Sequence, residues 1–80
     1  MQNILVDNNM NKLRDILQKR GITPYQLAKM AGIGEKTAYR YGSEVDDLNI
    51  DRIAYGTVWR IAKALDIKTE DLRSDDKVGD

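Results

Sequence analysis

The most constraining feature of this 80-residue chain is the run TPYQLAKMAGIGEKTAYRY at residues 23–41, in which small residues recur at close helical spacing. Thr23 followed by Pro24 is a strong helix-start signal, because threonine caps free N–H groups and proline suits the first turn. Gly32 can adopt the left-handed conformation that ends a helix. Ala28, four residues earlier, is small enough to let another helix approach. The run therefore predicts a helix, a tight turn and a second helix packed closely against the first.

The first of these helices is expected to run to about Ala31, and the second to begin after Gly34 and to end near Tyr41, before Gly42. Apolar residues at helical spacing line the seam between them; they are Leu27, Ala31, Ile33, Ala38 and Tyr41. This combination is typical of a helix-turn-helix, a motif that places its second helix in the major groove of DNA.

The chain outside this motif is expected to add three more helices. An asparagine from the stretch before residue 10 is expected to cap a helix over about 10–20, which Gly21 ends. The apolar spacing predicts a further helix over about 56–65. Thr69 is expected to cap a short fifth helix that contains Leu72.

A small two-stranded β ribbon is also expected, formed by residues 3–6 and 50–53, because each segment is rich in apolar, β-favouring residues near polar ones. The fold class is therefore all-α, a compact five-helix bundle with this ribbon as an addition. The domain is expected to occupy residues 10–73. An N-terminal extension over 1–9 would carry the first strand, and residues 74–80 would form a flexible tail.

The formal charge is zero, but the charges are unevenly distributed along the chain. Residues 10–42 carry seven Lys or Arg and two acids, and residues 52–65 carry three Lys or Arg and no acid. Four acids lie in 43–51, and residues 66–80 have a net charge of −3. This separation of positive from negative segments suits a protein that turns one positively charged side toward DNA. The simpler alternative is that these charges solvate helix faces.

Composition narrows the function classes. The chain has no Cys and no His, which removes disulfides, thiolate metal sites and the commonest general base. No nucleophile or phosphate-loop motif is present, so neither an enzyme nor a bound cofactor is expected. Asp47, Asn49 and Asp51 have the spacing of a calcium loop, but Arg52 and Val58 stand where that loop needs Gly and Glu, so no metal is expected. Without a secretory leader or an apolar run of ~18 residues, we expect a cytoplasmic protein with no membrane partner.

Three stretches, GITPYQLAKMAGIGEKTAYRY, RIAKALDI and TEDL, resemble in order and spacing the Cro and lambda-repressor type of helix-turn-helix domain, also called Xre-like. The resemblance covers about 11–73. It implies a lambda-repressor-like five-helix bundle that binds operator DNA, and so a sequence-specific transcriptional regulator, of phage or bacterial repressor type. The residues then expected to contact DNA are Thr23, Tyr25, Gln26, Gly34, Glu35, Lys36, Thr37, Tyr39 and Arg40.

These residues are expected to play different parts. Lys36 and Arg40 are expected to read sequence, since each can donate to guanine O6 and N7, Arg as a bidentate fork. Glu35 can accept from a cytosine amino group or favour the positive start of its helix. Thr37 can contact a thymine methyl or a phosphate. Tyr39 is expected to point outward, within reach of a phosphate, and Gly34, Thr23 and Gln26 are expected to lie near phosphates. Tyr25 is expected either to donate to a phosphate or to pack against the second helix of the motif. The plain alternative is an ordinary solvated helix face.

The chain also departs from the family pattern. Pro24 stands where relatives often carry a phosphate-contacting Gln, which leaves Thr23 and the two residues after Pro24 as substitutes. Leu17 and Gly42 occupy positions where many relatives pair an Arg with a Glu, so an apolar seam is expected there. The loop over 43–51 is acidic rather than basic, so it is expected to point away from DNA or to contact something else.

The resemblance implies a homodimer, at least on DNA, that binds an inverted repeat. The surface between the copies is expected to involve the fifth helix and apolar residues such as Trp59 or Ile67; the core is the other place expected for Trp59. An alternative function is a protein-interaction module, such as an antitoxin or accessory subunit, because fold does not determine function and the acidic loop suits a protein partner.

Overall fold

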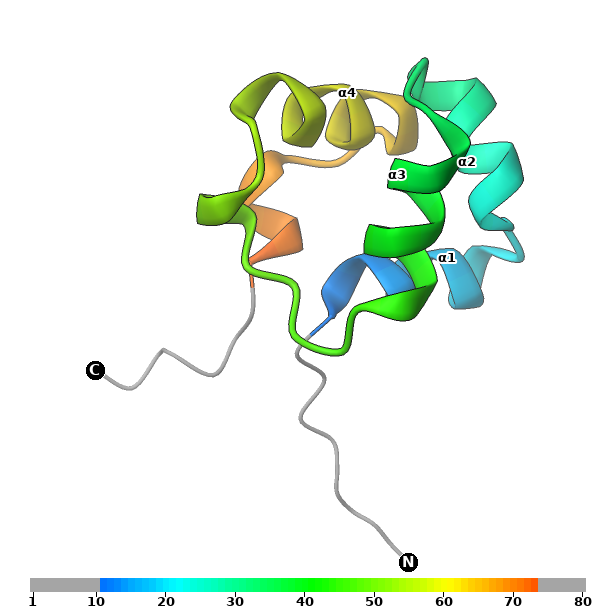
Figure 1. The fold of residues 1–80 in the computed structure, drawn as a ribbon, viewed down its shortest axis with the longest axis horizontal. Coiled ribbons are helices and arrows are strands. Elements are labelled where there is room, and N and C mark those ends of the chain that lie inside the picture. Colours follow the sequence, from blue (N-terminus) through cyan, green and yellow to red (C-terminus); the bar gives the residue numbers. More distant parts are fainter. Residues whose placement is uncertain (1–10, 74–80) are drawn as a thin grey trace, which may run out of the picture.

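The computed structural model describes residues 11–73, which form helices and helical turns packed around one core (Figure 1). The elements are α1 (Lys12–Arg20), α2 (Pro24–Ala31), α3 (Glu35–Tyr39), the π-helical turn η2 (Arg40–Glu44), the 3-10 turn η3 (Ile50–Arg52), α4 (Tyr55–Leu65) and the 3-10 turn η4 (Thr69–Leu72). The all-α fold class is confirmed. No helix in the described part is long and apolar enough to cross a membrane. The extension predicted over 1–9 and the tail predicted over 74–80 lie outside the described residues.

The core is built from apolar side chains of every α-helix and of the two segments that flank α4. Its buried members are Leu13, Leu17, Leu27, Ala28, Ala31, Ala38, Leu48, Val58, Ile61, Ala62, Leu65 and Leu72. Ile33 and Tyr41 are half-buried and pack against this cluster. The seam residues predicted for the helix-turn-helix therefore all face inward.

The start of α1 is held by Asn11, whose Oδ1 accepts from the backbone N–H of Arg14 at 2.9 Å. The cap thus lies beyond the stretch where an asparagine cap was predicted, and the helix begins at Lys12. Asn11 is fully buried. Its Nδ2 donates to the backbone oxygens of Tyr41, at 3.0 Å, and Val45, at 2.6 Å. One side chain therefore joins the first turn of α1 to the turn after α3.

Local signals alone account for the ends of α2. The Thr23 hydroxyl accepts from the N–H of Gln26 at 3.1 Å, and Oε1 of Gln26 accepts from the N–H of Thr23 at 2.9 Å, a reciprocal capping box. Pro24 is the first helical residue. Gly32 ends the helix with φ at +68°, in the left-handed region. Ala28 is 4% exposed, as its place at a close helix crossing requires.

The second helix of the motif was predicted to end near Tyr41, before Gly42, and the structure shows a further turn beyond that point. Its α-helical part ends at Tyr39, and the chain then continues through the π-helical turn η2 to Glu44. Gly42 lies inside this turn and is buried. A Cβ atom there would lie 2.9 Å from Cδ1 of Leu17, so α1 leaves no space for a side chain. The apolar seam predicted at Leu17 and Gly42 is confirmed.

The strand predicted over 50–53 is wrong, because this segment forms the 3-10 turn η3; its predicted partner, 3–6, lies outside the described residues. Oδ1 of Asn49 accepts from the backbone N–H two residues later at 3.0 Å and so starts the turn. Residues three apart share one side of a 3-10 helix. Ile50 and Ile53 can therefore both pack against the core, which a strand would not allow.

The last two elements differ from the prediction mainly at their starts. The helix α4 begins at Tyr55, one residue early. The fifth helix is the 3-10 turn η4, and Thr69 is its first residue rather than its cap. Instead, Oδ2 of Asp71 accepts from the N–H of Lys68 at 3.0 Å. Leu72 is buried, as expected, and ties this turn to the core.

Candidate nucleic-acid interface

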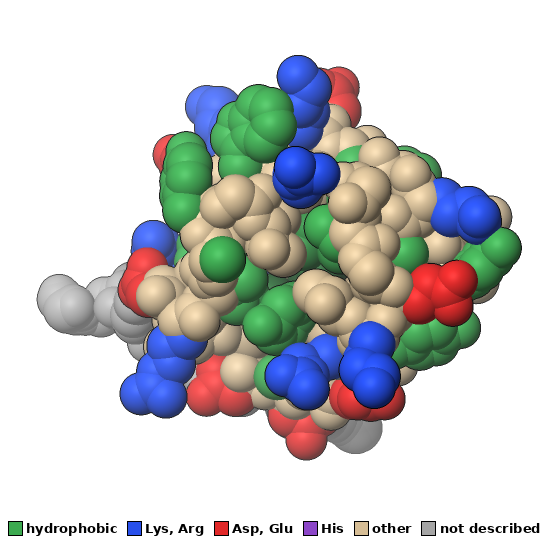
Figure 2. Space-filling model, turned by 45° about the horizontal axis from the view of Figure 1, so that its top comes forward, with side chains coloured by type: hydrophobic (Ala, Val, Ile, Leu, Met, Phe, Trp, Pro, Cys, Tyr) green, Lys and Arg blue, Asp and Glu red, His purple; other side chains and the backbone are tan. Residues whose placement is uncertain are grey.

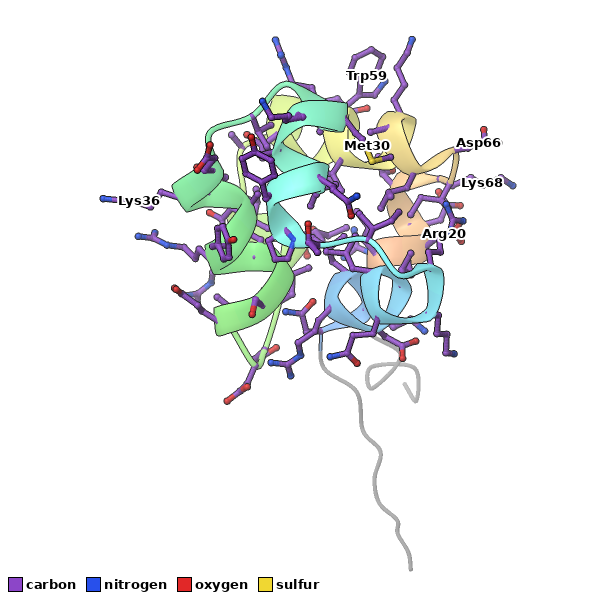
Figure 3. All side chains as sticks on the ribbon, turned by 90° about the vertical axis from the view of Figure 1, so that its right-hand side faces the viewer. Arg20, Met30, Lys36, Trp59, Asp66 and Lys68 are labelled. Atoms are coloured by element: carbon purple, nitrogen blue, oxygen red, sulfur yellow. The ribbon has the colours of Figure 1, made fainter. Side chains whose placement is uncertain are left out.

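The outward face of α3 presents two rows of side chains. Ala38 is fully buried and fixes which side of the helix faces the core. On the other side, Glu35 lies one turn before Tyr39 and Lys36 one turn before Arg40, and all four are exposed. Figure 3 shows Lys36 pointing away from the body of the molecule. The structure thus places these four predicted residues together on one accessible surface, which we call the α3 face.

The charges on the α3 face are not neutralised by the fold. Neither Lys36 nor Arg40 forms an ion pair with any residue between 11 and 73. Gly34, the residue before α3, supplies no side-chain cap, so the first N–H groups of the helix can donate elsewhere. Thr37 is half-buried beside them. Cations and backbone donors on one surface are suited to binding an anionic ligand.

The predicted residues on α2 lie near the far end of the α3 face. A Cβ atom at Gly42 would lie 4.0 Å from Cγ of Pro24, so the start of α2 is beside η2 rather than beside Gly34. The capping box uses the hydroxyl oxygen of Thr23 and Oε1 of Gln26, which leaves the amide N–H groups of Gln26 as exposed donors.

Tyr25 is 44% exposed, and Nζ of Lys29 lies 5.0 Å from the centre of its ring. A cation over an aromatic face is attracted by the ring quadrupole, and at an exposed site this contributes about 0.5–1 kcal/mol. The phenol of Tyr25 is therefore accessible at the start of α2, next to a cation one turn along the same helix.

Other basic residues make contacts within the fold that sequence reasoning missed. Nη1 of Arg14 donates to the backbone oxygen of Ser43 at 3.1 Å and to Oδ1 of Asp46 at 3.2 Å. Nη1 of Arg20 donates to the backbone oxygen of Leu65, at the C-terminus of α4, at 2.6 Å. Arg14 therefore has an acidic partner, whereas Arg20 keeps its charge and is held in place by a neutral carbonyl. Through Asp46 the acidic loop contacts α1.

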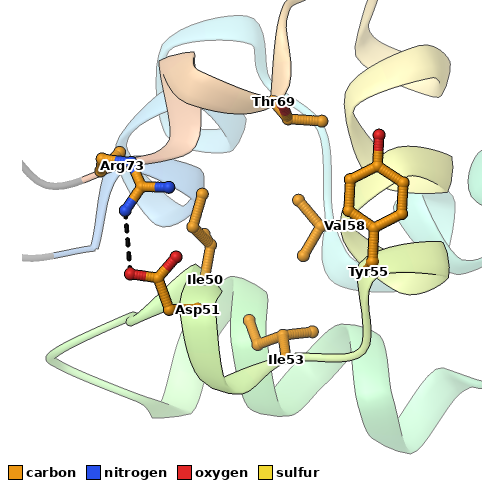
Figure 4. A pocket seen from close by; sticks show the side chains of 7 residues that line it. All are labelled: Ile50, Asp51, Ile53, Tyr55, Val58, Thr69 and Arg73. Carbon is orange, nitrogen blue, oxygen red and sulfur yellow. Dashed lines mark hydrogen bonds and ion pairs between the residues drawn. The ribbon is translucent and has the colours of Figure 1, made fainter.

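A small hollow lies among η3, the start of α4 and η4 (Figure 4). An ion pair closes one side, with Nη1 of Arg73 2.9 Å from Oδ2 of Asp51. This hydrogen bond, and the charge of Asp51, raise the pKa of Arg73. The hollow holds about 230 Å³, below the ~300 Å³ at which ligand pockets usually begin. We interpret it as imperfect packing bridged by an ion pair. Among residues 11–73, no group of three His, Cys, Asp or Glu side chains is placed to hold a metal ion.

The two residues considered for a surface between copies differ in exposure. Ile67 is half-buried and packs against the core. Trp59 is 47% exposed, so its interpretation as a core residue is wrong. Trp59 lies one turn before Lys63, beside the face of α4 that carries Val58, so helical spacing is the signal that could have found its exposure.

A family model of the Cro/C1-type HTH DNA-binding domain matches residues 12–77. The chain belongs to this family. Searches among curated proteins and among solved structures gave no match. Family membership confirms the resemblance that the sequence carries, and it supports DNA as the partner of this Cro/C1-type domain. In helix-turn-helix domains the second helix enters the major groove of DNA, and in this chain α2, Gly32 and α3 form that motif.

Proposed function

We propose that this Cro/C1-type domain is a sequence-specific transcriptional regulator of repressor type, which reads the major groove with α3. It acts in the cytoplasm by occupying an operator, without catalysis, cofactor or metal. The observation that carries the proposal is the α3 face, where Lys36 and Arg40 project from the second helix of the motif without an acidic partner among residues 11–73. An exposed cation held on a helix is suited to donate to guanine in the groove.

Base readout is assigned mainly to Arg40 and Lys36. The guanidinium of Arg40 matches O6 and N7 of guanine as a bidentate fork, whereas Lys36 donates as a point charge. Glu35, in the parallel row, accepts from a cytosine amino group. The negative charge of this carboxylate repels a nearby phosphate. Glu35 therefore limits the positions along the major groove at which α3 can bind.

Backbone contacts are assigned to the residues around the ends of the α3 face. The amide of Gln26 and the phenol of Tyr25 donate to phosphates at the start of α2. The hydroxyl of Thr23, which donates to Oε1 of Gln26 at a long 3.4 Å, turns to the same phosphates on binding. At the start of α3, the free N–H groups after Gly34 do the same. Thr37 and Tyr39 complete the set with hydroxyl donors. These contacts set register and orientation and carry no sequence information of their own.

A homodimer on DNA follows from the size of the α3 face. One short helix reads too few base pairs to define a useful site, and a two-fold dimer doubles that number. The operator is then an inverted repeat with half-sites about one helical turn, ~34 Å, apart. Sedimentation at saturating protein should give two chains per specific duplex, and one chain per duplex would contradict the dimer.

The first test is selection of bound sequences from a random duplex pool. The expected output is an inverted repeat with a guanine at a fixed position in each half-site. Failure to enrich any sequence, together with retention of a protein partner, would favour the interaction-module alternative instead.

The second test compares Arg40→Ala with Lys29→Ala, an exposed cation on α2 outside the α3 face. Arg40→Ala is expected to weaken operator binding by about 1–3 kcal/mol and to relax preference at one base pair per half-site. Lys29→Ala is expected to weaken binding to all sequences alike and to make the salt slope shallower by about one unit. Binding is measured on operator and scrambled duplexes at two salt concentrations. Equal loss on both duplexes for Arg40→Ala would exclude direct readout by this residue.

A further inference from the structure

A second surface of the domain is an open groove between α2 and α4. Its volume is about 490 Å³, and its lining residues are Met30, Ala31, Trp59, Arg60, Lys63 and Ala64. We call it the α2–α4 groove. Figure 3 shows Trp59 at the top of the molecule and Met30 below it, whereas Lys36 projects to the side. The groove therefore faces a different direction from the α3 face.

Two large apolar side chains of the groove are about half exposed to water. Met30 is 49% exposed and Trp59 47% exposed, although their helices have well-packed core faces. Burial of a large apolar side chain stabilises a fold, and about half of that gain is left unused at both positions. Tryptophan and methionine are enriched in protein interfaces, and neighbouring exposed apolar residues mark such sites. Methionine adapts its shape to different partners.

The charge of the groove specifies its partner more narrowly. The lining includes two cations and no acid. Nζ of Lys63 lies 5.0 Å from the centre of the Trp59 ring. Nη1 of Arg60 donates to the backbone oxygen of Gly32 at 3.4 Å, which leaves its other N–H groups available. Neither cation forms an ion pair with any residue in the described range 11–73. Figure 2, turned to bring the α4 side forward, shows hydrophobic side chains beside Lys and Arg side chains.

We propose that the α2–α4 groove binds a short acidic segment of a partner protein, which places one aliphatic or aromatic side chain against Trp59 and Met30 and its carboxylates beside Arg60 and Lys63. The apolar side chain gains burial, and the carboxylates replace water around two unpaired cations. Because the groove and the α3 face point in different directions, the domain can hold this segment while α3 lies in the groove of DNA. The proposal stands on the groove alone and does not depend on base readout.

The test selects peptides from a random display library on the full-length protein. We expect the selected peptides to contain Asp or Glu on both sides of one Leu, Met or Phe. Trp59 is the only tryptophan of the chain, so its fluorescence reports directly on the groove. A selected peptide, synthesised without tryptophan, is expected to shift the Trp59 emission to shorter wavelength as the ring is buried.

Two charge reversals provide the matched comparison. Lys63→Glu changes the groove, and Lys68→Glu makes the same change at an exposed position outside its lining. Lys63→Glu is expected to weaken peptide binding by at least about tenfold, and Lys68→Glu by less than about twofold. Met30→Ser keeps both the cations and the reporter, and it is expected to weaken binding without abolishing the acidic preference.

Several results would overturn the proposal. Selected peptides without an acidic bias, or peptides that bind the parent and Lys63→Glu alike, would show that the groove does not recognise this class of segment. Uniform loss of binding to all DNA duplexes in Lys63→Glu would assign the groove to phosphate contact. An emission shift that grows with protein concentration alone, and disappears in Met30→Ser, would make the groove an interface between two copies.

Discussion

The turn between α2 and α3 and the connection between α3 and α4 both interrupt helices, but they are held in different ways. In the first, Gly32 ends α2 through its own backbone conformation, with φ at +68°. The cap at the other end of α2 pairs residues three apart, Thr23 and Gln26. In the second, the backbone oxygens of Tyr41 and Val45 accept from Asn11, 30 and 34 residues away. The first is a local structure, and the second depends on α1.

This difference has a functional consequence. The local turn positions α3 against α2, so the α3 face is set by neighbouring residues. The connection instead carries the acidic stretch, and Arg14 holds Asp46 at 3.2 Å on the α1 side. That exposed pair contributes at most about 1 kcal/mol. Stronger restraints on the connection come from buried Asn11, from the close approach of Leu17 to Gly42 and from Leu48, which is buried in the core.

The largest expected effect is at Asn11. Asn11→Ala removes the cap of α1 and takes the Asn11 donor away from two partly buried carbonyl groups, so a loss of about 2–4 kcal/mol in the free energy of unfolding is expected. Chemical denaturation measures it. Asn11→Asp is the discriminating variant, because aspartate caps helices as well as asparagine does but has no N–H to donate. A variant Asn11→Asp as stable as the parent would reduce the role of this residue to capping.

The next effect tests the local half of the comparison. Ala28→Leu is expected to destabilise the fold by about 1–3 kcal/mol, because a close helix crossing cannot take the added methyl groups. Lys29→Leu, at the adjacent exposed position, is the control and is expected to change stability by less than about 0.5 kcal/mol. Thermal melting of both variants checks the prediction. Equal melting temperatures for Ala28→Leu and the parent would mean that α2 and α3 do not cross tightly at this residue.

The smallest expected effects on stability come from two glycine substitutions, one in the local turn and one in the connection that depends on α1. Gly32→Ala is expected to cost about 1–2 kcal/mol because alanine is strained at a positive φ. Gly42→Ala is expected to cost about 1 kcal/mol, since the clash with Leu17 exceeds the gain in helix preference.

Adding Leu17→Val separates the two causes. The shorter side chain is expected to reduce the cost of Gly42→Ala and to leave that of Gly32→Ala unchanged, since only residues in contact couple. A double-mutant cycle on unfolding free energies measures this. Additive effects at Gly42 would remove the tertiary explanation for that glycine.

The sequence predicted most of the candidate site and less of its surroundings. Glu35, Lys36, Tyr39 and Arg40 follow from the turn at Gly32 by helical spacing, and all are exposed as expected. The use of Gln26 in a capping box was not foreseen, although the spacing from Thr23 is the signal that would have found it. The exposure of Trp59 has a signal in its spacing of one turn from Lys63, whereas the groove beside it depends on how α4 packs against α2 and has no signal in the linear pattern.

What the sequence determined by itself is the helix-turn-helix and the residues along its outer face. Capping, the left-handed glycine and helical spacing act between residues at most four apart, so they are readable along the chain. Only the tertiary structure decided the rest: the π-helical turn through Gly42, the 3-10 turn at Ile50–Arg52 in place of a strand, and the pairing of Arg14 with Asp46. These features depend on contacts between residues that are far apart in the sequence. A local sequence pattern cannot predict which distant residue will make the contact.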